Sequence, residues 1–320
     1  MDLLDLTSCH LCPRNCGVNR EAGETGFCGL PAEIRAARAA LLYYEEPCIS
    51  GTAGSGAIFF TGCNLGCVFC QNTEISSGLR GGPSSYAGEP IDVGRLAQIM
   101  LQLQEQGASN INLVTPSHVL HVLIPALKKA KTDGLRIPVV YNTSSYEKAE
   151  ALRALEGLVD IYLPDLKYHS TQLAASYSKA PDYWEAATAA IKEMIRQCPK
   201  PIFEDGSSSL DEADDWDDPL MMRGVIVRHM VMPGHTEDSK EILRYLYETY
   251  GNRIFISIMN QYTPMPQCAA DSLLSRPVTK KEYDEVIDFA ISLGIENGFL
   301  QEGGTISKSF IPAWDGTGIL

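Results

Sequence analysis

The sequence lacks long hydrophobic stretches: none of its apolar runs approaches the roughly 18 residues that a membrane-spanning helix needs. Residues 1–7 have neither the basic start nor the apolar stretch of a secretory signal. Basic residues are also scarce, because 26 Lys and Arg stand against 40 Asp and Glu and give a net charge of −14. This balance argues against broad affinity for nucleic-acid phosphates. We therefore expect a soluble, cytoplasmic protein with no membrane or nucleic-acid partner.

Much of the negative charge is local. Residues 204–218 hold eight acidic residues and no basic one. Such a run predicts a solvated, mobile loop, and an acidic docking surface is the alternative.

Cysteine, by contrast, is abundant, and seven of the ten residues lie in two groups within the first 70 positions. Without a secretory signal, clustered cysteines indicate metal binding rather than disulfides. Cys198 and Cys268 are isolated, and we expect them to be structural.

Short apolar runs alternate with helical segments from residue 57 onward. The runs occupy residues 57–61, 110–114, 137–141, 159–163, 224–231 and 254–258. Most are rich in β-branched or aromatic residues and lack simple alternation, which is typical of parallel strands buried on both faces. The helical segments span residues 93–106, 119–132, 182–197, 236–250 and 279–293. Asp92 and Thr279 are the expected N-caps, and Glu282 completes a capping box with Thr279.

This alternation predicts right-handed βαβ units, and hence a doubly wound sheet or a barrel, complete or partial. Residues 1–56 are rich in Cys, Gly and Arg and predict a small metal-binding lobe before a domain of residues 57–320. All six expected strands end in polar residues, at positions 62–63, 115–118, 142–145, 164–167, 228–229 and 260–262. Chemistry gathers at the carboxyl ends of such strands, so we expect a shared polar cavity there.

The first expected strand leads into Cys63-Asn-Leu-Gly-Cys67-Val-Phe-Cys70. Three thiolates at this spacing can hold one side of a [4Fe–4S] cluster and leave one iron open to a substrate. A plain electron carrier closes its cluster with four cysteines. A zinc knuckle or three unrelated core cysteines are the alternatives.

The motif and its place after the first strand resemble the radical S-adenosylmethionine (SAM) superfamily, in which an aromatic residue such as Phe69 also precedes the last cysteine. Segments along nearly the whole chain, among them EEPCISG, VVYNTSSYE, VDIYLPDLKY and NQYTPM, resemble the branch related to pyruvate formate-lyase activating enzyme. The resemblance implies a partial (β/α)6 barrel with a [4Fe–4S] cluster on Cys63, Cys67 and Cys70. It further implies that SAM binds the open iron and is reductively cleaved to a 5′-deoxyadenosyl radical, which abstracts hydrogen from a substrate.

The resemblance also assigns roles to residues at the strand ends. Asp165-Leu166-Lys167 matches the Asp-x-Lys motif of glycyl-radical activating enzymes, so Lys167 would pair with the methionine carboxylate. Asn142-Thr143 stands where those enzymes have Asp-Thr beside a monovalent cation, and the missing charge puts that cation in doubt. Arg228 matches an arginine that contacts the cofactor's ribose or carboxylate.

The second strand departs from the superfamily pattern. Most members have Gly-Gly-Glu there, which binds the cofactor's amino group, whereas this chain has Thr115-Pro116-Ser117. Backbone carbonyls and the Thr115 or Ser117 hydroxyl would have to accept those hydrogen bonds. Gln261 stands near a sixth-strand histidine of the relatives and completes the expected cofactor-binding set. No catalytic residue beyond the cluster can be assigned.

Cys9, Cys12, Cys16 and Cys28 form the second group, interleaved with glycines. Four thiolates in twenty residues suggest a closed metal site. A structural zinc ion is the favoured interpretation, with a second [4Fe–4S] cluster as the alternative, and Cys48 is a substitute ligand.

Two kinds of enzyme fit these motifs: an activating enzyme that installs a glycyl radical in a protein partner, or a radical enzyme that modifies a small molecule or peptide side chain. Both require an electron donor such as flavodoxin or ferredoxin. A non-catalytic iron–sulfur carrier is a third hypothesis, against which the missing fourth ligand argues.

Overall fold

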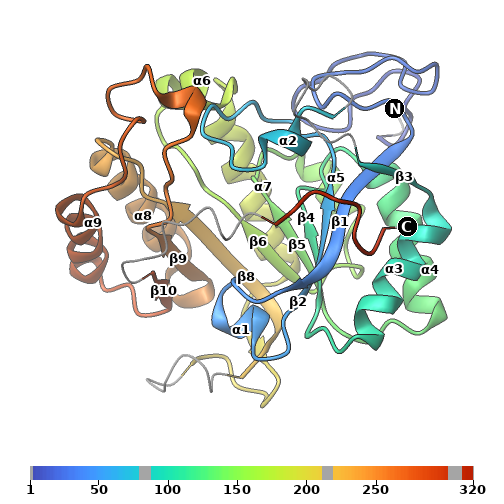
Figure 1. The fold of residues 1–320 in the computed structure, drawn as a ribbon. Helices are drawn as coiled ribbons and strands as arrows, with labels where there is room; N and C mark the ends of the chain where they lie inside the picture. Colours follow the sequence, from blue (N-terminus) through green and yellow to red (C-terminus); the bar gives the residue numbers. More distant parts are fainter. Residues whose placement is uncertain (1–2, 79–87, 211–218, 302–311, 320) are drawn as a thin grey trace.

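The computed structural model of the 320-residue chain describes residues 3–78, 88–210, 219–301 and 312–319. Its centre is a curved sheet in which six strands run parallel and lie side by side in sequence order (Figure 1). These strands are β2 (Ser55–Phe60), β4 (Ile111–Val114), β5 (Val139–Thr143), β6 (Ile161–Pro164), β8 (Met221–Met230) and β9 (Phe255–Met259). They coincide with the six expected strands to within three residues. The fold is a partial (β/α)6 barrel, as predicted.

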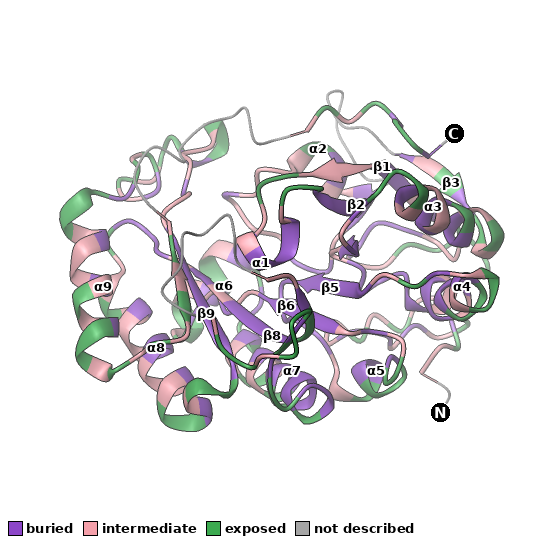
Figure 2. Cartoon of the chain, turned by 90° about the horizontal axis from the view of Figure 1, so that it is seen from below, coloured by how far each residue is buried: buried purple, intermediate pink, exposed green. Residues whose placement is uncertain are grey.

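Helices follow the parallel strands and cover the outside of the sheet. They are α3 (Val93–Glu105), α4 (Leu120–Asp133), α5 (Ala149–Arg153), α6 (Thr171–Ser178), α7 (Tyr183–Gln197), α8 (Thr236–Tyr250) and α9 (Lys280–Leu293). Asp92 caps α3, since its carboxylate accepts from the Arg95 N–H at 2.7 Å. Thr279 and Glu282 form the predicted capping box of α9. Seen from below, the strands are buried and the outer helices carry the exposed side chains (Figure 2).

The sheet begins earlier than the sequence indicated. β1 (Ile34–Leu42) pairs antiparallel with β2, and β3 (Glu89–Ile91) pairs with the other side of β1. Strand β1 of the sheet therefore lies within the segment 1–56 that was expected to form a small lobe, and the boundary at residue 57 stays a prediction. The segment of β1, IRAARAALL, is dominated by Ala and Arg, which are poor indicators of a strand. At the other edge, β10 (Gly298–Leu300) adds parallel to β9, and β7 (Ile202–Phe203) pairs antiparallel with β8.

The two ends of the barrel differ. The loops after β2, β6 and β9, with α2 (Thr73–Ser76) and the 3₁₀ turn η3 (Pro266–Cys268), lie at the upper end in Figure 1 together with the N-terminal segment. The short helix α1 (Pro47–Ser50) lies at the opposite end. There Cys48 and Ile49 pack among side chains of the strands, including Ile161 and Ile226. Helix α1 thus plugs the lower mouth, and the upper mouth is left for chemistry.

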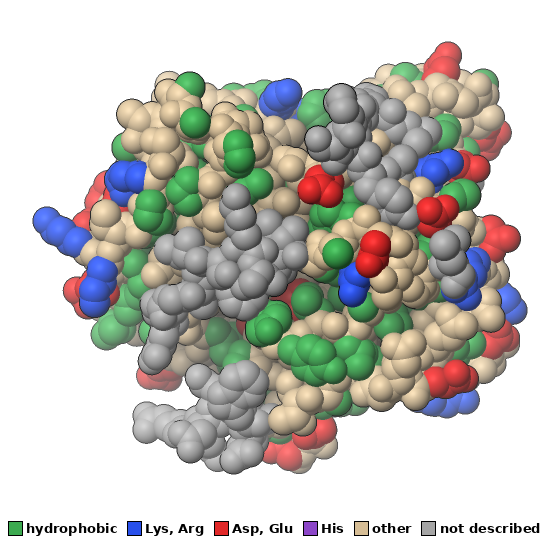
Figure 3. Space-filling model, viewed as in Figure 1, with side chains coloured by type: hydrophobic (Ala, Val, Ile, Leu, Met, Phe, Trp, Pro, Cys, Tyr) green, Lys and Arg blue, Asp and Glu red, His purple; other side chains and the backbone are tan. Residues whose placement is uncertain are grey.

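A second 3₁₀ turn, η2 (Gly251–Arg253), joins α8 to β9. Residues 204–210 of the acidic run are described, whereas residues 211–218 and 302–311 lie outside the described ranges. On the face drawn in Figure 3, the described Lys and Arg side chains are scattered among acidic ones and form no continuous basic surface. Within the described ranges, no helix combines the length and apolar character needed to cross a membrane.

Candidate functional site

The loop after β2 brings the three predicted cluster ligands to the upper mouth of the barrel. Cys63, Cys67 and Cys70 are all half-buried. Gly62, at the start of the loop, has φ +88°, and a Cβ there would lie 2.7 Å from the Cys28 carbonyl oxygen. Only glycine fits this turn without displacing the neighbouring backbone. The Cys67 Sγ lies 2.9 Å from the Ser178 hydroxyl, so α6 holds the far side of the loop.

Burial has the same effect on the pKa of all three thiols. Burial raises the pKa of Cys63 and of Cys67, and it raises the pKa of Cys70 to about 11. The thiols are therefore protonated without metal, and metal binding must release their protons. Among the described residues, no three His, Cys, Asp or Glu side chains converge as the ligands of one ion would. The ligands of a cubane cluster lie farther apart than the ligands of a single ion, because each thiolate binds a different iron. Three half-buried thiols on one loop fit that group.

A network of charged side chains lies inside the barrel beside this loop. Lys167 donates from Nζ to Asp165 Oδ2 at 2.6 Å, and Arg228 donates from Nε to Asp165 Oδ1 at 2.9 Å. Arg228 also donates to Asn142 Oδ1 at 2.6 Å and to Glu45 Oε2 at 3.0 Å. The structure thus brings four of the predicted cofactor-binding residues together: Asn142, Asp165, Lys167 and Arg228.

The network fixes the charge of its members. Burial opposes ionisation of Asp165, but Arg228 and Lys167 outweigh it and lower the pKa of the Asp165 carboxyl. Burial likewise opposes the charge of Lys167, but Asp165 and Cys67 outweigh it and raise the pKa of the ammonium group. Lys167 is therefore a cation close to the cysteine loop.

Two buried side chains hold the Asp165–Lys167 turn in place. The Tyr183 hydroxyl accepts from the Lys167 N–H at 3.0 Å and lies 2.8 Å from the Asp165 carbonyl oxygen. The His229 Nδ1 lies 2.8 Å from the Leu166 carbonyl oxygen, and its Nε2 lies 2.8 Å from the Ser239 hydroxyl. Burial lowers the pKa of His229, which keeps the ring neutral. Both side chains position the turn without entering the cavity.

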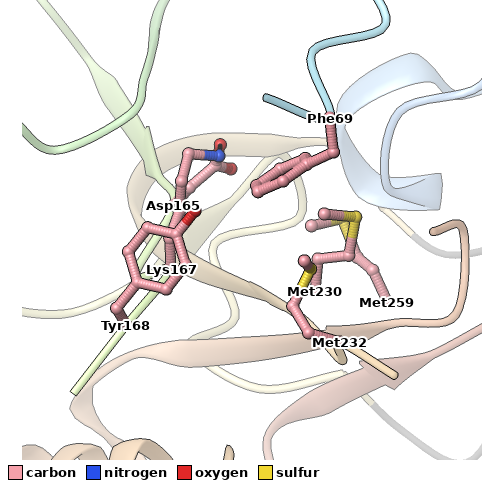
Figure 4. A pocket seen from close by; sticks show the side chains of 7 residues that line it. All are labelled: Phe69, Asp165, Lys167, Tyr168, Met230, Met232 and Met259. Carbon is pink, nitrogen blue, oxygen red and sulfur yellow. Dashed lines mark hydrogen bonds and ion pairs between the residues drawn. The ribbon is translucent and has the colours of Figure 1, made fainter. Parts of the chain in front are cut away.

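A pocket of about 230 Å³ opens between the cysteine loop and this turn. Figure 4 shows Asp165, Lys167 and Tyr168 on one side, with Phe69 opposite them and three methionine side chains below Phe69. The methionines are Met230, the last residue of β8, Met232, just after that strand, and Met259, at the end of β9. Phe69 also contacts the Tyr262 ring edge-on, at 6.0 Å between centroids. The pocket joins one charged corner to a polarisable, apolar wall.

A second polar cluster holds the ends of β4 and β5 together. Ser117 and Thr143 donate to Glu147 Oε1 at 2.5 and 2.6 Å, and the Tyr141 hydroxyl lies 3.2 Å from the same oxygen. Burial raises the pKa of Glu147 to about 7. The hydroxyls of Ser117 and Thr143 are thus engaged with Glu147 rather than directed into the pocket.

The other expected residues take different places. Thr115 has φ +55°, a left-handed conformation, and its N–H donates to the Asn142 carbonyl. Gln261 donates to the sulfur of Met259 at 3.0 Å, next to the pocket wall. His118 is buried, with Nε2 2.7 Å from the Thr61 carbonyl oxygen, and burial lowers its pKa to about 3.

Two acidic residues of this region, Glu45 and Glu147, were not among the residues predicted from the sequence. Both lie in segments that carry the family resemblance, EEPCISG and VVYNTSSYE, but neither had an assigned role. In the sequence, each is only an acidic residue that follows an apolar run, a pattern that does not by itself indicate a buried carboxylate. The structure shows that both carboxylates lie inside the barrel, where Glu45 contacts Arg228 and Glu147 contacts Ser117 and Thr143.

The N-terminal cysteines surround a separate cavity that packs against the first site. Arg14 donates from Nε to the Asn64 carbonyl at 2.8 Å, which ties the N-terminal segment to the Cys63–Cys70 loop. Cys48 lies in α1 at the other end of the barrel, so it is not placed to substitute for these ligands (Figure 1).

Part of the chain matches a known family model. Residues 57–202 match the family model of the Radical SAM superfamily. An uncharacterized protein of Methanocaldococcus jannaschii is 27% identical over 284 residues, which cover 88% of this chain and 74% of that protein.

Solved structures give weaker likenesses. A radical SAM methyltransferase from Sphaerobacter thermophilus has a TM-score of 0.48 at 14% identity, over 78% of this chain and 67% of that chain. Streptococcus suis SuiB bound to the precursor peptide SuiA has a TM-score of 0.46 at 12% identity, over 75% of this chain but only 46% of SuiB. A domain of a pyruvate-formate lyase-activating enzyme from Bacteroides vulgatus has a TM-score of 0.36 at 12% identity, over 57% of this chain and 91% of that domain.

Proposed function

We propose that this protein cleaves S-adenosylmethionine reductively and passes the radical to a substrate by abstracting a hydrogen atom, in keeping with the match of residues 57–202 to the Radical SAM superfamily model. The observation that carries the proposal is the pocket of Figure 4, which joins the loop of Cys63, Cys67 and Cys70 to the Asp165–Lys167 turn. When bound to these cysteines, the cluster supplies the single electron that the cleavage needs.

The charged corner of the pocket suits the amino-acid part of SAM. The Lys167 ammonium has three N–H donors, of which the hydrogen bond to Asp165 uses one. The others can bind the methionine carboxylate through a charge-assisted contact. Arg228 and Asn142 stand behind Asp165 and fix its orientation. The cofactor is thereby held by groups that are already in place before it binds.

The apolar wall suits the rest of the molecule. Phe69 and the thioethers of Met230 and Met259 offer a polarisable surface for the adenosyl and sulfonium groups. A wall of this kind also excludes water, which protects a reactive species until it meets its substrate. Glu147, with Ser117 and Thr143, keeps the ends of β4 and β5 together beneath the site.

For the substrate, we propose a protein partner in which a glycyl radical is installed. This rests on the resemblance of Asp165-Leu166-Lys167 to the motif of glycyl-radical activating enzymes. The electron comes from a low-potential donor of the flavodoxin or ferredoxin class.

The test of the cleavage step uses anaerobically reconstituted, dithionite-reduced protein incubated with SAM. We expect 5′-deoxyadenosine from the native chain and from Cys198→Ala, a matched control in which a buried cysteine outside the site is removed. The Cys67→Ala variant should make none. An intact cluster that yields no 5′-deoxyadenosine would overturn the proposal, and so would turnover by Cys67→Ala.

The test of the partner uses electron paramagnetic resonance. A glycyl radical doublet is expected in a co-expressed glycyl-radical protein from the same host. Absence of the doublet in every such protein, together with sound cleavage of SAM, would assign the enzyme to small-molecule or peptide modification instead.

A further inference from the structure

The four N-terminal cysteines line one cavity, outside the site proposed to bind SAM. The cavity encloses about 280 Å³ together with its mouth, and its other walls include Arg20 and Phe27. The cysteines are Cys9, Cys12, Cys16 and Cys28, all with free thiols.

The backbone around the cavity is folded to bring the sulfur atoms inward. Cys9 donates its N–H to the Val18 carbonyl and accepts from the Gly17 N–H, each at 2.9 Å, which closes the chain into a tight loop. A Cβ on Gly26 would lie 2.8 Å from the Cys16 Sγ. Glycine at this position is therefore required for the sulfur to sit where it does. The Phe27 N–H lies 3.4 Å from the same sulfur.

Arg20 places a buried positive charge at the wall of the cavity. Its side chain is 1% exposed, and its guanidinium donates to the backbone carbonyls of Leu30, Pro31 and His118. Its Nη1 lies 4.0 Å from the Cys9 sulfur. Within the described ranges, no carboxylate forms an ion pair with Arg20. A buried cation without a counter-charge is strongly unfavourable, and four neutral thiols supply none. Four metal-bound thiolates do.

The arrangement of the four cysteines bears on the choice between a cluster and zinc. Around a single zinc ion four thiolates stand about 2.3 Å from one point. In the part of the chain that the structure describes, neither these cysteines nor Cys63, Cys67 and Cys70 converge on one point in this way. Within the described ranges, neither cysteine group is thus arranged as the ligands of a single ion.

We propose that Cys9, Cys12, Cys16 and Cys28 bind a second [4Fe–4S] cluster, closed by four protein ligands, with the Arg20 guanidinium as its buried counter-charge. The sequence alone favoured zinc, but among the described residues no group is arranged to hold a single ion, and the contact with the first site favours a cluster. The second cluster would lie directly against the first site. Phe27, which lines its cavity, packs on Gly66 next to Cys67, where a Cβ would lie 3.3 Å from the phenyl ring. A closed cluster in this place is suited to electron transfer rather than substrate binding.

The decisive experiment isolates the second site. The variant Cys63→Ala/Cys67→Ala/Cys70→Ala removes the first set of ligands, and the protein is then purified anaerobically and reconstituted with iron and sulfide. We expect about four iron and four sulfide per chain, the content of one [4Fe–4S] cluster, and a paramagnetic signal after reduction with dithionite. Adding Cys12→Ala and Cys16→Ala should abolish both. One zinc per chain without iron would overturn the proposal.

A second variant guards against loss of folding in the first. In Cys12→Ala/Cys16→Ala, the first site is intact, and iron should fall to about half of the native content. Cys198→Ala should keep the full content. Iron that is unchanged in Cys12→Ala/Cys16→Ala would also overturn the proposal. None of these measurements depends on SAM cleavage, so failure here is distinct from failure of the proposed function.

Discussion

Arg228 donates from Nη1 to Glu45 Oε2 over 3.0 Å, although the two residues stand 183 positions apart in the chain. Glu45 precedes the helix α1 that plugs the lower mouth of the barrel, and its other oxygen accepts from Asn112 and Asn142. The plug thus does more than close the barrel. It carries a carboxylate into the interior, where Arg228 lies between Glu45 and Asp165.

We expect Glu45→Ala to destabilise the fold and to weaken SAM binding. The substitution leaves Arg228 without one of its two carboxylates, and removing one partner of a buried ion pair costs about 3 to 5 kcal/mol. Arg228 would shift toward Asp165 and disturb the pair with Lys167. Urea unfolding under anaerobic conditions and equilibrium dialysis with SAM measure the two effects.

Glu33→Ala is the matched control. Glu33 forms a 2.9 Å pair with Arg35, but its side chain is 54% exposed. Exposed pairs contribute at most about 1 kcal/mol, so the control should unfold nearly as the native protein does. If Glu45→Ala and Glu33→Ala lose equal stability, Glu45 is not part of a buried network.

Lys167→Gln should lower the affinity for SAM at unchanged iron content. Glutamine keeps a hydrogen-bond donor but loses the charge, and hydrogen bonds to charged groups contribute about 1.5 to 3 kcal/mol. The dissociation constant should therefore rise at least about tenfold. Lys129→Gln is the control, because Lys129 forms an exposed pair with Asp133 on α4. An unchanged affinity in Lys167→Gln would show that the carboxylate binds elsewhere.

The framework of the barrel could be predicted because its signals are local. Six apolar runs marked the parallel strands, and the expected helix 236–250 agrees with α8 to the residue. Strand β1 was not predicted, because Ala and Arg are weak indicators of a strand and because its position depends on pairing with β2. The role of Glu45 depends on its contact with Arg228, which is 183 positions away in the chain, and no local sequence pattern indicates such a contact.

Neighbouring residues of the site show a second limit on what the sequence alone can predict about side-chain positions. Asn142 and Thr143 were both expected at the cofactor, yet side chains alternate across a strand, so consecutive residues face opposite sides. In β5, Asn142 faces Arg228 and Thr143 faces Glu147. Alternation lets only one of the two side chains face Arg228, and in the structure that residue is Asn142.

Ile49→Ala should test the plug by itself. Ile49 is fully buried between the strands at the lower mouth. Truncating a buried isoleucine to alanine costs about 2 to 5 kcal/mol, and we expect a loss in this range by urea unfolding. On α9, Ile291 is 66% exposed, and Ile291→Ala should change stability by at most about 0.5 kcal/mol. A near-neutral Ile49→Ala would mean that α1 does not pack as a plug.

Glu147 should make the stability of the fold depend on pH. Its pKa is raised by burial from 4.5 to about 7, so the folded state holds a proton that the unfolded state has lost between these values. The contribution of Glu147 to stability is therefore full below pH 4.5 and is lost as pH rises to about 7, by roughly 3 kcal/mol in total. Glu147→Gln keeps an oxygen for the hydroxyls of Ser117, Thr143 and Tyr141 but cannot ionise.

The measurement is the difference in unfolding free energy between the native protein and Glu147→Gln, taken at intervals from pH 5 to pH 8. Contributions from the clusters and from other titrating groups cancel in this difference, because both proteins share them. The native protein should lose stability relative to Glu147→Gln up to about pH 7, and the difference should then level off. A constant difference across the range would mean that Glu147 is already ionised at pH 5. The three hydroxyls would then serve to stabilise a buried carboxylate anion instead of a neutral acid.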